Sequence, residues 1–400
     1  MKKTLSAFLL LNFSFLIYAN AQLGPEITSW IVNTTGATGY NSIPSNVQQV
    51  QYSTNNVYIS ATCIPDYNIG PWPGNPNTPT NQNFVYKITR NPTQNTGTAT
   101  AVGMGHIGVW TNGVSIYNVS DGMSYNNQGI WNRNAYFWEG ASFDSCLGHP
   151  APNGEYHHHV SPACLYDEND STHHSPIIGY AFDGYPVYGA YAYTNTNGTG
   201  PIKRMKPSYV LATATTRTNG PAVSATYPLG CFMEDYTYTT SSGDLDQRNG
   251  RVCITPEYPT GTYAYFATIN APLTPSFPYT FYKTYYGIVQ SGNTGPGSGH
   301  NTITETVIIY TSVNELEQKI EVNVFPNPTS DYLNIYVQPG LESNIRATIV
   351  NPLGQEIISK ENIQPAVQYA FDLSNLSEGI YYLKLEANGV SSVKKIIVTK

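Results

Sequence analysis

Short segments with apolar, β-branched and aromatic residues recur along the chain up to about residue 312. Segments of five to eight such residues, separated by Gly, Asn and Asp, are typical of β-strands joined by turns. No stretch of about 12 residues in this region has helical periodicity. We therefore predict a β-rich main domain. Its clearest candidate strands lie in VYISATC (57–63), NFVYKITR (83–90), GVWTNGVSIYNV (108–119), PIIGYAFDGYPVYGAYAY (176–193) and GTYAYFATI (261–269).

The pattern changes after the polar segment SVNELEQK (312–319). Lysines and glutamates return, cysteines and histidines vanish, and apolar and polar residues alternate as in a small Ig-like β-sandwich. The predicted fold is thus all-β: a large, irregular sandwich or barrel-like main domain (22–312), a linker (313–321) and a small Ig-like sandwich (322–400).

The first 21 residues read as a secretory signal peptide. Lys2 and Lys3 precede an apolar run, and Ala19 and Ala21 supply the small residues expected before a cleavage site at Gln22. A membrane anchor fits less well, because Asn12 and two serines interrupt a run that is too short to span a bilayer. No later stretch approaches 18 apolar residues, so we expect an exported protein without a transmembrane segment.

Composition narrows the range of partners. Only 11% of the residues are charged, the formal net charge is −7, and loss of the two leader lysines takes it to about −9. The sequence has no basic block. Nucleic acid is therefore excluded as a partner, because phosphate binding needs clustered Lys and Arg.

Five cysteines in an exported chain predict disulfides. Cys146 and Cys164 bracket a histidine-rich stretch, and their pairing would close a loop of roughly 18 residues. Cys231 and Cys253 form the next plausible pair across a turn-rich segment, which leaves Cys63 over, in the core. An alternative pairing through Cys63 stays open, and a thiolate metal ligand is the least favoured use of any of the five.

Six of the eight histidines fall between residues 149 and 174. On a strand, side chains at i and i+2 share a face, so His157 and His159 would converge while His158 points away as a structural residue. Two imidazoles at this spacing can begin a transition-metal site that is completed from elsewhere. The candidate ligands are His157, His159 and His174, with His149 and Asp183 as auxiliary groups.

Neutral imidazole favours copper or zinc as the cofactor. Calcium fits less well: a loop that begins with Asp244 and Asp246 has Arg248 where a third ligand is expected, and 166–170 is only an acidic turn. Three protein ligands would leave a position open for water or substrate, so a metalloenzyme is possible on this reading, but the reaction and the catalytic residues stay undefined.

Two other interpretations stay open. The 33 tyrosines and five tryptophans could stack on sugar rings, which would make the chain a carbohydrate- or surface-polymer-binding module without catalysis. A small-molecule ligand is a further possible partner. The clustered histidines would then only form hydrogen bonds within the fold. The same would hold for a purely structural surface protein. His106 and His300 stand alone in the sequence, and we interpret both as structural in every case.

Short motifs rich in Gly, aromatic residues and His lie along the main domain. They are 64–67 (IPDY), 108–110 (GVW), 124–126 (SYN), 148–152 (GHPAP), 154–159 (GEYHHH), 174–176 (HSP), 182–184 (FDG), 249–251 (NGR) and 255–266 (TPEYPTGTYAYF). With these motifs, residues from about 48 to 290 resemble the YHYH domain family. The second tyrosine of the family motif is replaced here by His158, which leaves both motif histidines, His157 and His159, in place. The resemblance supports the domain assignment and implies no particular reaction.

The C-terminal stretch contains four short motifs in a fixed order. They are Pro326-Asn327-Pro328, Gly354, Gly379-Ile380-Tyr381 and Lys394-Lys395-Ile396-Ile397-Val398. With these residues, the stretch resembles the sorting domain of proteins exported by the type IX secretion system. This resemblance implies export through the periplasm, recognition by the secretion machinery, and a final place on the cell surface or in the medium. An adhesive Ig-like module is the alternative.

Overall fold

The computed structural model describes residues 23–271, 274–295, 297–311, 320, 322–338, 345–387 and 390–400. The chain forms two compact units, the first ending at Thr311 and the second beginning at Ser312, and each is described by itself. The predicted signal peptide (1–21) lies outside the described residues, as does the predicted linker (313–321) apart from Ile320. Among the described segments, no helix has the length and apolar character needed to cross a membrane.

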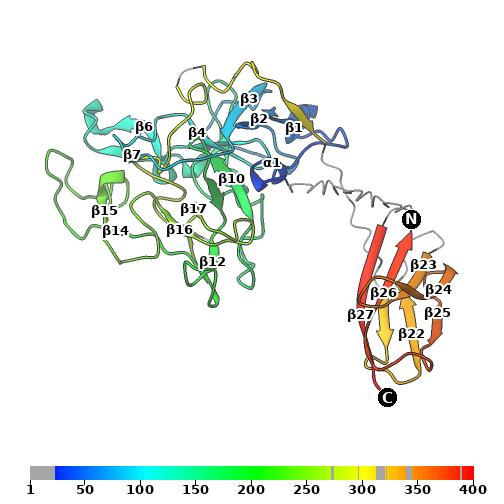
Figure 1. The fold of residues 1–400 in the computed structure, drawn as a ribbon. Coiled ribbons are helices and arrows are strands. Elements are labelled where there is room, and N and C mark those ends of the chain that lie inside the picture. The colour runs from blue at the N-terminus through cyan, green and yellow to red at the C-terminus, as the bar shows by residue number, and fades with distance from the viewer. Residues whose placement is uncertain are drawn as a thin grey trace, which may run out of the picture. The chain divides into compact units, whose positions relative to one another are not determined.

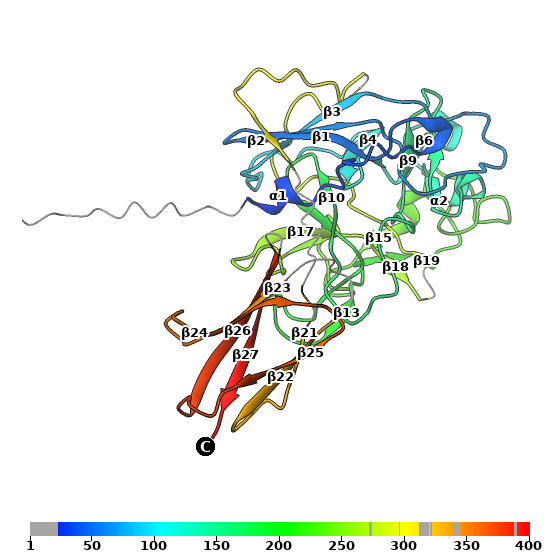
Figure 2. The ribbon, with the colours of Figure 1, turned by 90° about the vertical axis from the view of Figure 1, so that its right-hand side faces the viewer.

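The first unit contains an antiparallel sheet in the strand order β20–β1–β2–β3. Strands β1 to β3 run side by side in two views turned by 90° (Figures 1 and 2). The last strand of the unit, β20, pairs with its first strand, β1, so this sheet brings the beginning and the end of the unit's chain together. The strands are β1 (Val47–Tyr52), β2 (Asn56–Ala61), β3 (Phe84–Thr89) and β20 (Ile308–Tyr310).

A second, mixed sheet has the order β16–β17–β11–β10–β4–β5–β9–β8. Its neighbours are antiparallel except for β11 with β17 and β5 with β9, which run parallel. The strands are β4 (His106–Trp110), β5 (Ser115–Tyr117), β8 (His149–Pro150), β9 (Tyr156–His158), β10 (Ile177–Ala181), β11 (Pro186–Tyr188), β16 (Gly250–Cys253) and β17 (Thr262–Phe266).

In its described residues, the first unit also contains four short two-stranded sheets and several single helical turns. The longest described helix has four residues, which confirms the all-β prediction. The hairpin strands are β6 (Ser120–Ser124), β7 (Asn132–Asn134), β12 (Tyr191–Tyr193), β13 (Ile202–Arg204), β14 (Tyr209–Leu211), β15 (Tyr236–Tyr238), β18 (Ile269–Asn270) and β19 (Thr274–Pro275). The helical turns are α1 (Pro25–Thr28), η1 (Tyr40–Ser42), η2 (Tyr125–Asn127), α2 (Ala135–Trp138), η3 (Gly140–Ser142) and η4 (Met233–Asp235).

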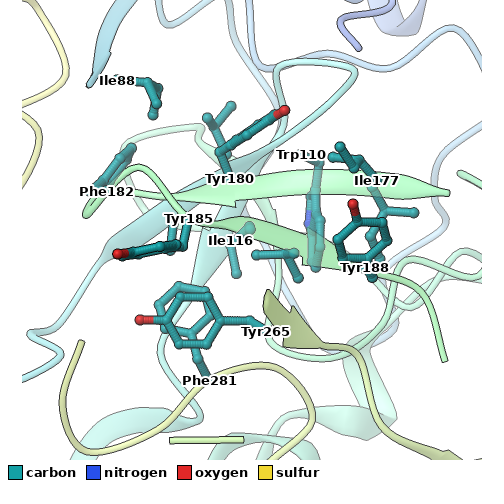
Figure 3. Packing of buried hydrophobic residues seen from close by; sticks show 14 of the residues in the cluster. Ile88, Trp110, Ile116, Ile177, Tyr180, Phe182, Tyr185, Tyr188, Tyr265 and Phe281 are labelled. Carbon is teal, nitrogen blue, oxygen red and sulfur yellow. The ribbon is translucent and has the colours of Figure 1, made fainter. Parts of the chain in front are cut away.

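One large core lies between the two sheets and takes side chains from both. Aromatic rings fill much of it, and Figure 3 shows Tyr180, Tyr265 and Phe281 around the central strands. Strands β4 and β10 are buried along their whole length, as expected for strands covered on both faces. Their close approach requires glycine: a Cβ atom at Gly108 would lie 2.6 Å from the carbonyl oxygen of Tyr180.

The second unit is a small β-sandwich of two sheets, β21–β22–β25 and β24–β23–β26–β27. Alternating residues of β22 face a shared apolar core, as the sequence pattern predicts. The strands are β21 (Val322–Phe325), β22 (Tyr332–Val337), β23 (Ile345–Val350), β24 (Glu356–Ile363), β25 (Gln368–Asp372), β26 (Gly379–Ala387) and β27 (Val390–Val398).

The structure confirms one predicted disulfide and contradicts the other. Cys146 and Cys164 are bonded, at a sequence separation of 18. Cys231 and Cys253 are both free and buried: Cys231 precedes η4, and Cys253 ends β16 opposite Thr262. Cys63 is free and buried, as expected for the cysteine left over.

Candidate metal centre

Three histidines meet at the end of the mixed sheet. His149 on β8 is the antiparallel partner of His157 on β9, so their side chains stand next to each other on one face. His159 follows two residues later and lies on the same side as His157, which is the arrangement that the i, i+2 spacing predicts. One ring nitrogen from each histidine lies within 4.8 Å of the other two, and all three residues are buried. The auxiliary candidate, His149, is thus a member of the cluster.

Hydrogen bonds fix the tautomers of His157 and His159. The Nδ1 atom of His157 lies 3.0 Å from the carbonyl oxygen of Glu155, and Nδ1 of His159 contacts the carbonyl oxygen of Asn118. A carbonyl oxygen can only accept, so both Nδ1 atoms carry a proton. In the neutral rings, the two Nε2 atoms are therefore unprotonated, yet they face each other at 3.0 Å.

His149 is fixed in the same tautomer through Ser142. The Ser142 hydroxyl donates to the carbonyl oxygen of Glu139 at 2.7 Å, so its oxygen accepts from Nδ1 of His149 at 2.8 Å. The Nε2 atom of His149 is then also unprotonated. Three nitrogen lone pairs consequently point into one small space.

A carboxylate completes this arrangement. Glu139 caps the C-terminal end of α2, and its Oε2 atom lies 3.2 Å from Nε2 of His159 and 3.8 Å from Nε2 of His149. This oxygen is buried and makes no hydrogen bond within the described residues. Four electron-rich atoms thus face one another, which is favourable only when a cation or a proton lies between them.

The pKa values of the site favour the protonation states that bind a cation. Burial, together with the charge of neighbouring His159, lowers the pKa of His149 to about 4. Burial, then His149 and His159, lowers the pKa of His157 well below its usual value. Burial alone would raise the pKa of Glu139, but its close pairing with His159 and the charges of His149 and Arg133 outweigh burial and lower it. At neutral pH, His149 and His157 are therefore neutral and Glu139 is ionised.

The structure does not bring His174 into this cluster. His174 precedes β10, and strands β4 and β5 stand between β10 and β9 in the sheet. At the usual spacing of neighbouring strands, the backbones of β10 and β9 are about 14 Å apart. The Nδ1 atom of His174 donates to the carbonyl oxygen of Ser175, and its ring packs against Tyr188.

Asp183 is also placed elsewhere, in the turn between β10 and β11. Its carboxylate accepts hydrogen bonds from the hydroxyl of Tyr265 (2.7 Å) and from the backbone N–H groups of Gly287 (2.8 Å) and Tyr185 (3.2 Å). Burial outweighs these bonds and raises its pKa to about 6. Asp183 therefore ties the central sheet to a distant loop, and it lies outside the three-histidine group.

The remaining histidines take other places. His158 is buried on the opposite face of β9, where its ring packs edge-on against Tyr156 and Trp110. His106 forms a buried ion pair with Glu155, and His300 lies at the surface.

The carboxylates of the two segments with calcium-loop character, 244–248 and 166–170, form hydrogen bonds or ion pairs within the protein. Lys203 lies 2.6 Å from Asp244. Asp246 accepts from two backbone N–H groups and the Tyr263 hydroxyl. In the acidic turn, Asp170 accepts from Thr172 and His173.

The cluster opens into a cleft with a volume of about 540 Å³. Two carboxylates, Asp121 and Glu139, line the cleft, and its described lining includes no lysine or arginine. The lining residues are Pro73, Gly74, Asn75, Pro76, Asn77, Met104, Gly105, Tyr117, Ser120, Asp121, Trp138, Glu139, Ala141, Ser142, His149, Pro150, Ala151, Pro152, His157 and His159. A ligand can therefore reach the histidines from solvent, and the charge of the cleft favours a cation.

Of the four groups that converge, Glu139 is the one that sequence reasoning missed. It lies ten residues before His149, at the C-terminal cap of a one-turn helix, and no motif links the two. Its carboxylate belongs to a chain with few charged residues, but this signal is too general to identify a ligand.

Comparison with protein families gives two matches in separate parts of the chain. Residues 85–278 match the family described as YHYH protein, and this stretch includes the three histidines and Glu139. Residues 323–399 match the secretion system C-terminal sorting domain. A search of curated proteins finds no match.

Proposed function

This chain is a YHYH protein that carries a secretion system C-terminal sorting domain, and from this premise we propose that its main unit binds one transition-metal ion, zinc or copper. The sorting domain indicates export to the cell surface or the medium and an interaction with the secretion machinery. We propose a route through the periplasm, with the N-terminal leader as the first address. The metal ligands would be His149, His157 and His159.

The observation that carries this proposal is the convergence of one ring nitrogen from each of three buried histidines. Zinc binds imidazole nitrogen at about 2.0–2.1 Å, so two nitrogens of a tetrahedral site lie about 3.3 Å apart. The Nε2 atoms of His157 and His159 are 3.0 Å apart, and all three ligand atoms lie within 4.8 Å of one another. Shifts of a few tenths of an ångström to about 1.5 Å would therefore bring the three rings to ligand distances.

Glu139 supplies either the fourth ligand or the group that faces an open fourth position. As a ligand, its carboxylate would close a tetrahedral site of three histidines and one glutamate. Facing an open position, it would hold a water molecule or substrate against the ion. Neutral imidazole is a ligand for zinc and copper alike, so the donor set supports both metals.

The first test is metal content and affinity of the purified mature chain. After chelation and reloading, we expect close to one zinc or copper per chain, and a His157→Ala/His159→Ala double variant that still folds should bind none. The matched control is His173→Ala, because His173 is an exposed histidine that neighbours only Thr172 and Asp170. A chain that folds and takes up no metal, or a double variant that binds as the unmutated chain does, would contradict the proposal.

A carbohydrate-binding module is the second candidate, supported by the aromatic side chains Trp138 and Tyr117 in the cleft. One face of Tyr117 is already covered, because its ring stacks on His157 with 3.7 Å between the ring centres. This candidate predicts that the metal-free chain binds a polysaccharide as tightly as the loaded chain. Affinity electrophoresis of both forms distinguishes the two functions.

A further inference from the structure

A buried ion pair lies directly behind the histidine cluster. The carboxylate of Glu155 accepts hydrogen bonds through Oε1 from Nδ1 of His106 (3.0 Å) and from the Ser115 hydroxyl (2.5 Å). Glu155 is only 2% exposed and His106 8%. Neither residue lines the cleft, so the pair belongs to the core and has no direct access to a ligand there.

Both ring nitrogens of His106 act as donors. The Ser298 hydroxyl donates to the carbonyl oxygen of Asn293 at 3.0 Å, so its oxygen accepts from Nε2 of His106 at 2.8 Å. The other nitrogen, Nδ1, donates to the Glu155 carboxylate. This is the hydrogen-bonding pattern of an imidazolium ion. A buried charge pair of this kind is often no more stable than an apolar replacement, so folding alone gives little reason for it.

Glu155 holds the metal-site histidine from two directions. Its backbone carbonyl oxygen accepts from Nδ1 of His157, which fixes the tautomer. Its carboxylate interacts electrostatically with the hydroxyl of Tyr117, and burial together with this interaction raises the pKa of that hydroxyl. The Tyr117 ring in turn stacks on His157, with 20° between the ring planes. The pairing of Ser115 with His157 across parallel strands β5 and β9 keeps these groups in register.

We propose that Glu155, anchored by His106, is a positioning residue that acts through Tyr117 and its own backbone to direct Nε2 of His157 at the metal. The inference rests on the proposed metal site. Outer partners of metal-bound histidines fix the ring orientation and the tautomer, and their loss typically lowers metal affinity about 10- to 100-fold.

The test measures the zinc affinity of folded, mature chains by competition with a chelator. Tyr117→Phe keeps the stacked ring and removes its hydroxyl, and we expect about a tenfold loss of affinity. Glu155→Gln weakens the whole anchor, and we expect a loss toward 100-fold. In both variants, the visible spectrum of bound Co²⁺ should also change, because the orientation of a ligand ring changes. A purely structural role would not alter this spectrum once the chain is folded.

The matched control is Tyr86→Phe. The Tyr86 hydroxyl bonds to the Ser115 hydroxyl at 2.9 Å, so this variant loses a buried tyrosine hydroxyl from the same network, but its ring does not stack on a cluster histidine. We expect its zinc affinity to stay within twofold of the unmutated chain. Equal losses in both Tyr→Phe variants, or an unchanged affinity and Co²⁺ spectrum in a folded Tyr117→Phe chain, would overturn the positioning role.

If the proposed metal site does not exist, the experiment gives a result that differs from loss of the positioning role alone. In that case the unmutated chain binds no zinc, and no variant is needed to show it. If Glu155→Gln does not fold, Tyr117→Phe decides the question alone, because it removes one oxygen atom and keeps the ring.

Discussion

The disulfide that closes the histidine loop should contribute a measurable part of the stability of the main unit. Cys146 and Cys164 have a sequence separation of 18, and the chain-entropy model gives about 3 kcal/mol for a loop of this length. All three histidines of the cluster lie inside the loop. We therefore expect a Cys146→Ala/Cys164→Ala variant to lose both stability and zinc affinity, because the unbridged loop has more freedom before the site forms.

Tryptophan fluorescence during urea unfolding isolates this effect. All five tryptophans precede residue 139, so the signal reports the main unit and not the sorting domain. We expect the unfolding free energy to fall by about 3 kcal/mol in the variant, and by a similar amount in the unmutated chain after reduction. The variant itself should not respond to reductant.

A Cys231→Ala/Cys253→Ala variant is the matched control, because it also lacks two cysteines and keeps the bridge. Its response to reductant should equal that of the unmutated chain. If mass mapping shows Cys146 bonded to Cys164 and yet reduction leaves both the unfolding free energy and the zinc affinity unchanged, the reasoning about the loop is refuted.

Three further predictions concern the rest of the main unit. The pKa of Asp183 is about 6 in the folded chain and near 3.8 in the unfolded chain, so the folded chain holds an extra proton between these pH values. The unfolding free energy should therefore decrease by up to about 3 kcal/mol as the pH rises from 4 to 6. Asp183→Asn should remove this pH dependence when unfolding is followed by fluorescence at a series of pH values. Asp235→Asn should lower the unfolding free energy measured in urea by about 3–5 kcal/mol, because it leaves the buried guanidinium of Arg217 without its carboxylate partner at 2.6 Å. A loss below about 1 kcal/mol would mean that the pair is hydrated. Thiol titration of the unreduced chain in denaturant should find three thiols, and a count of one would show that Cys231 and Cys253 pair after all.

Local sequence patterns predicted what depends on local geometry. Alternation along a strand placed His157 and His159 together and His158 on the opposite face, because side chains of a strand alternate whatever the sheet around it. Cys146 and Cys164 pair because a short, closed loop keeps both sulfurs in reach. The change of composition after residue 312 likewise separates two regions that form different compact units.

Strand order decided the rest, and strand order is a long-range property. His149 enters the cluster because β8 pairs with β9, whereas His174 precedes a strand that lies three positions away in the same sheet. Cys231 and Cys253 are close in sequence, yet both are free, because closeness along the chain does not by itself bring two sulfurs together. Glu139 could not be inferred at all, since only the fold of one helical turn against the sheet brings its carboxylate to His159.

X-ray absorption of the zinc-loaded, mature chain reports the atoms that surround the ion, so it tests directly whether His149, His157 and His159 bind the metal. We predict a coordination shell dominated by imidazole nitrogen at about 2.0–2.1 Å, with three histidines and no sulfur, and loss of this signal in His157→Ala/His159→Ala. A shell with sulfur at about 2.3 Å, or one with fewer than two imidazoles, would contradict it.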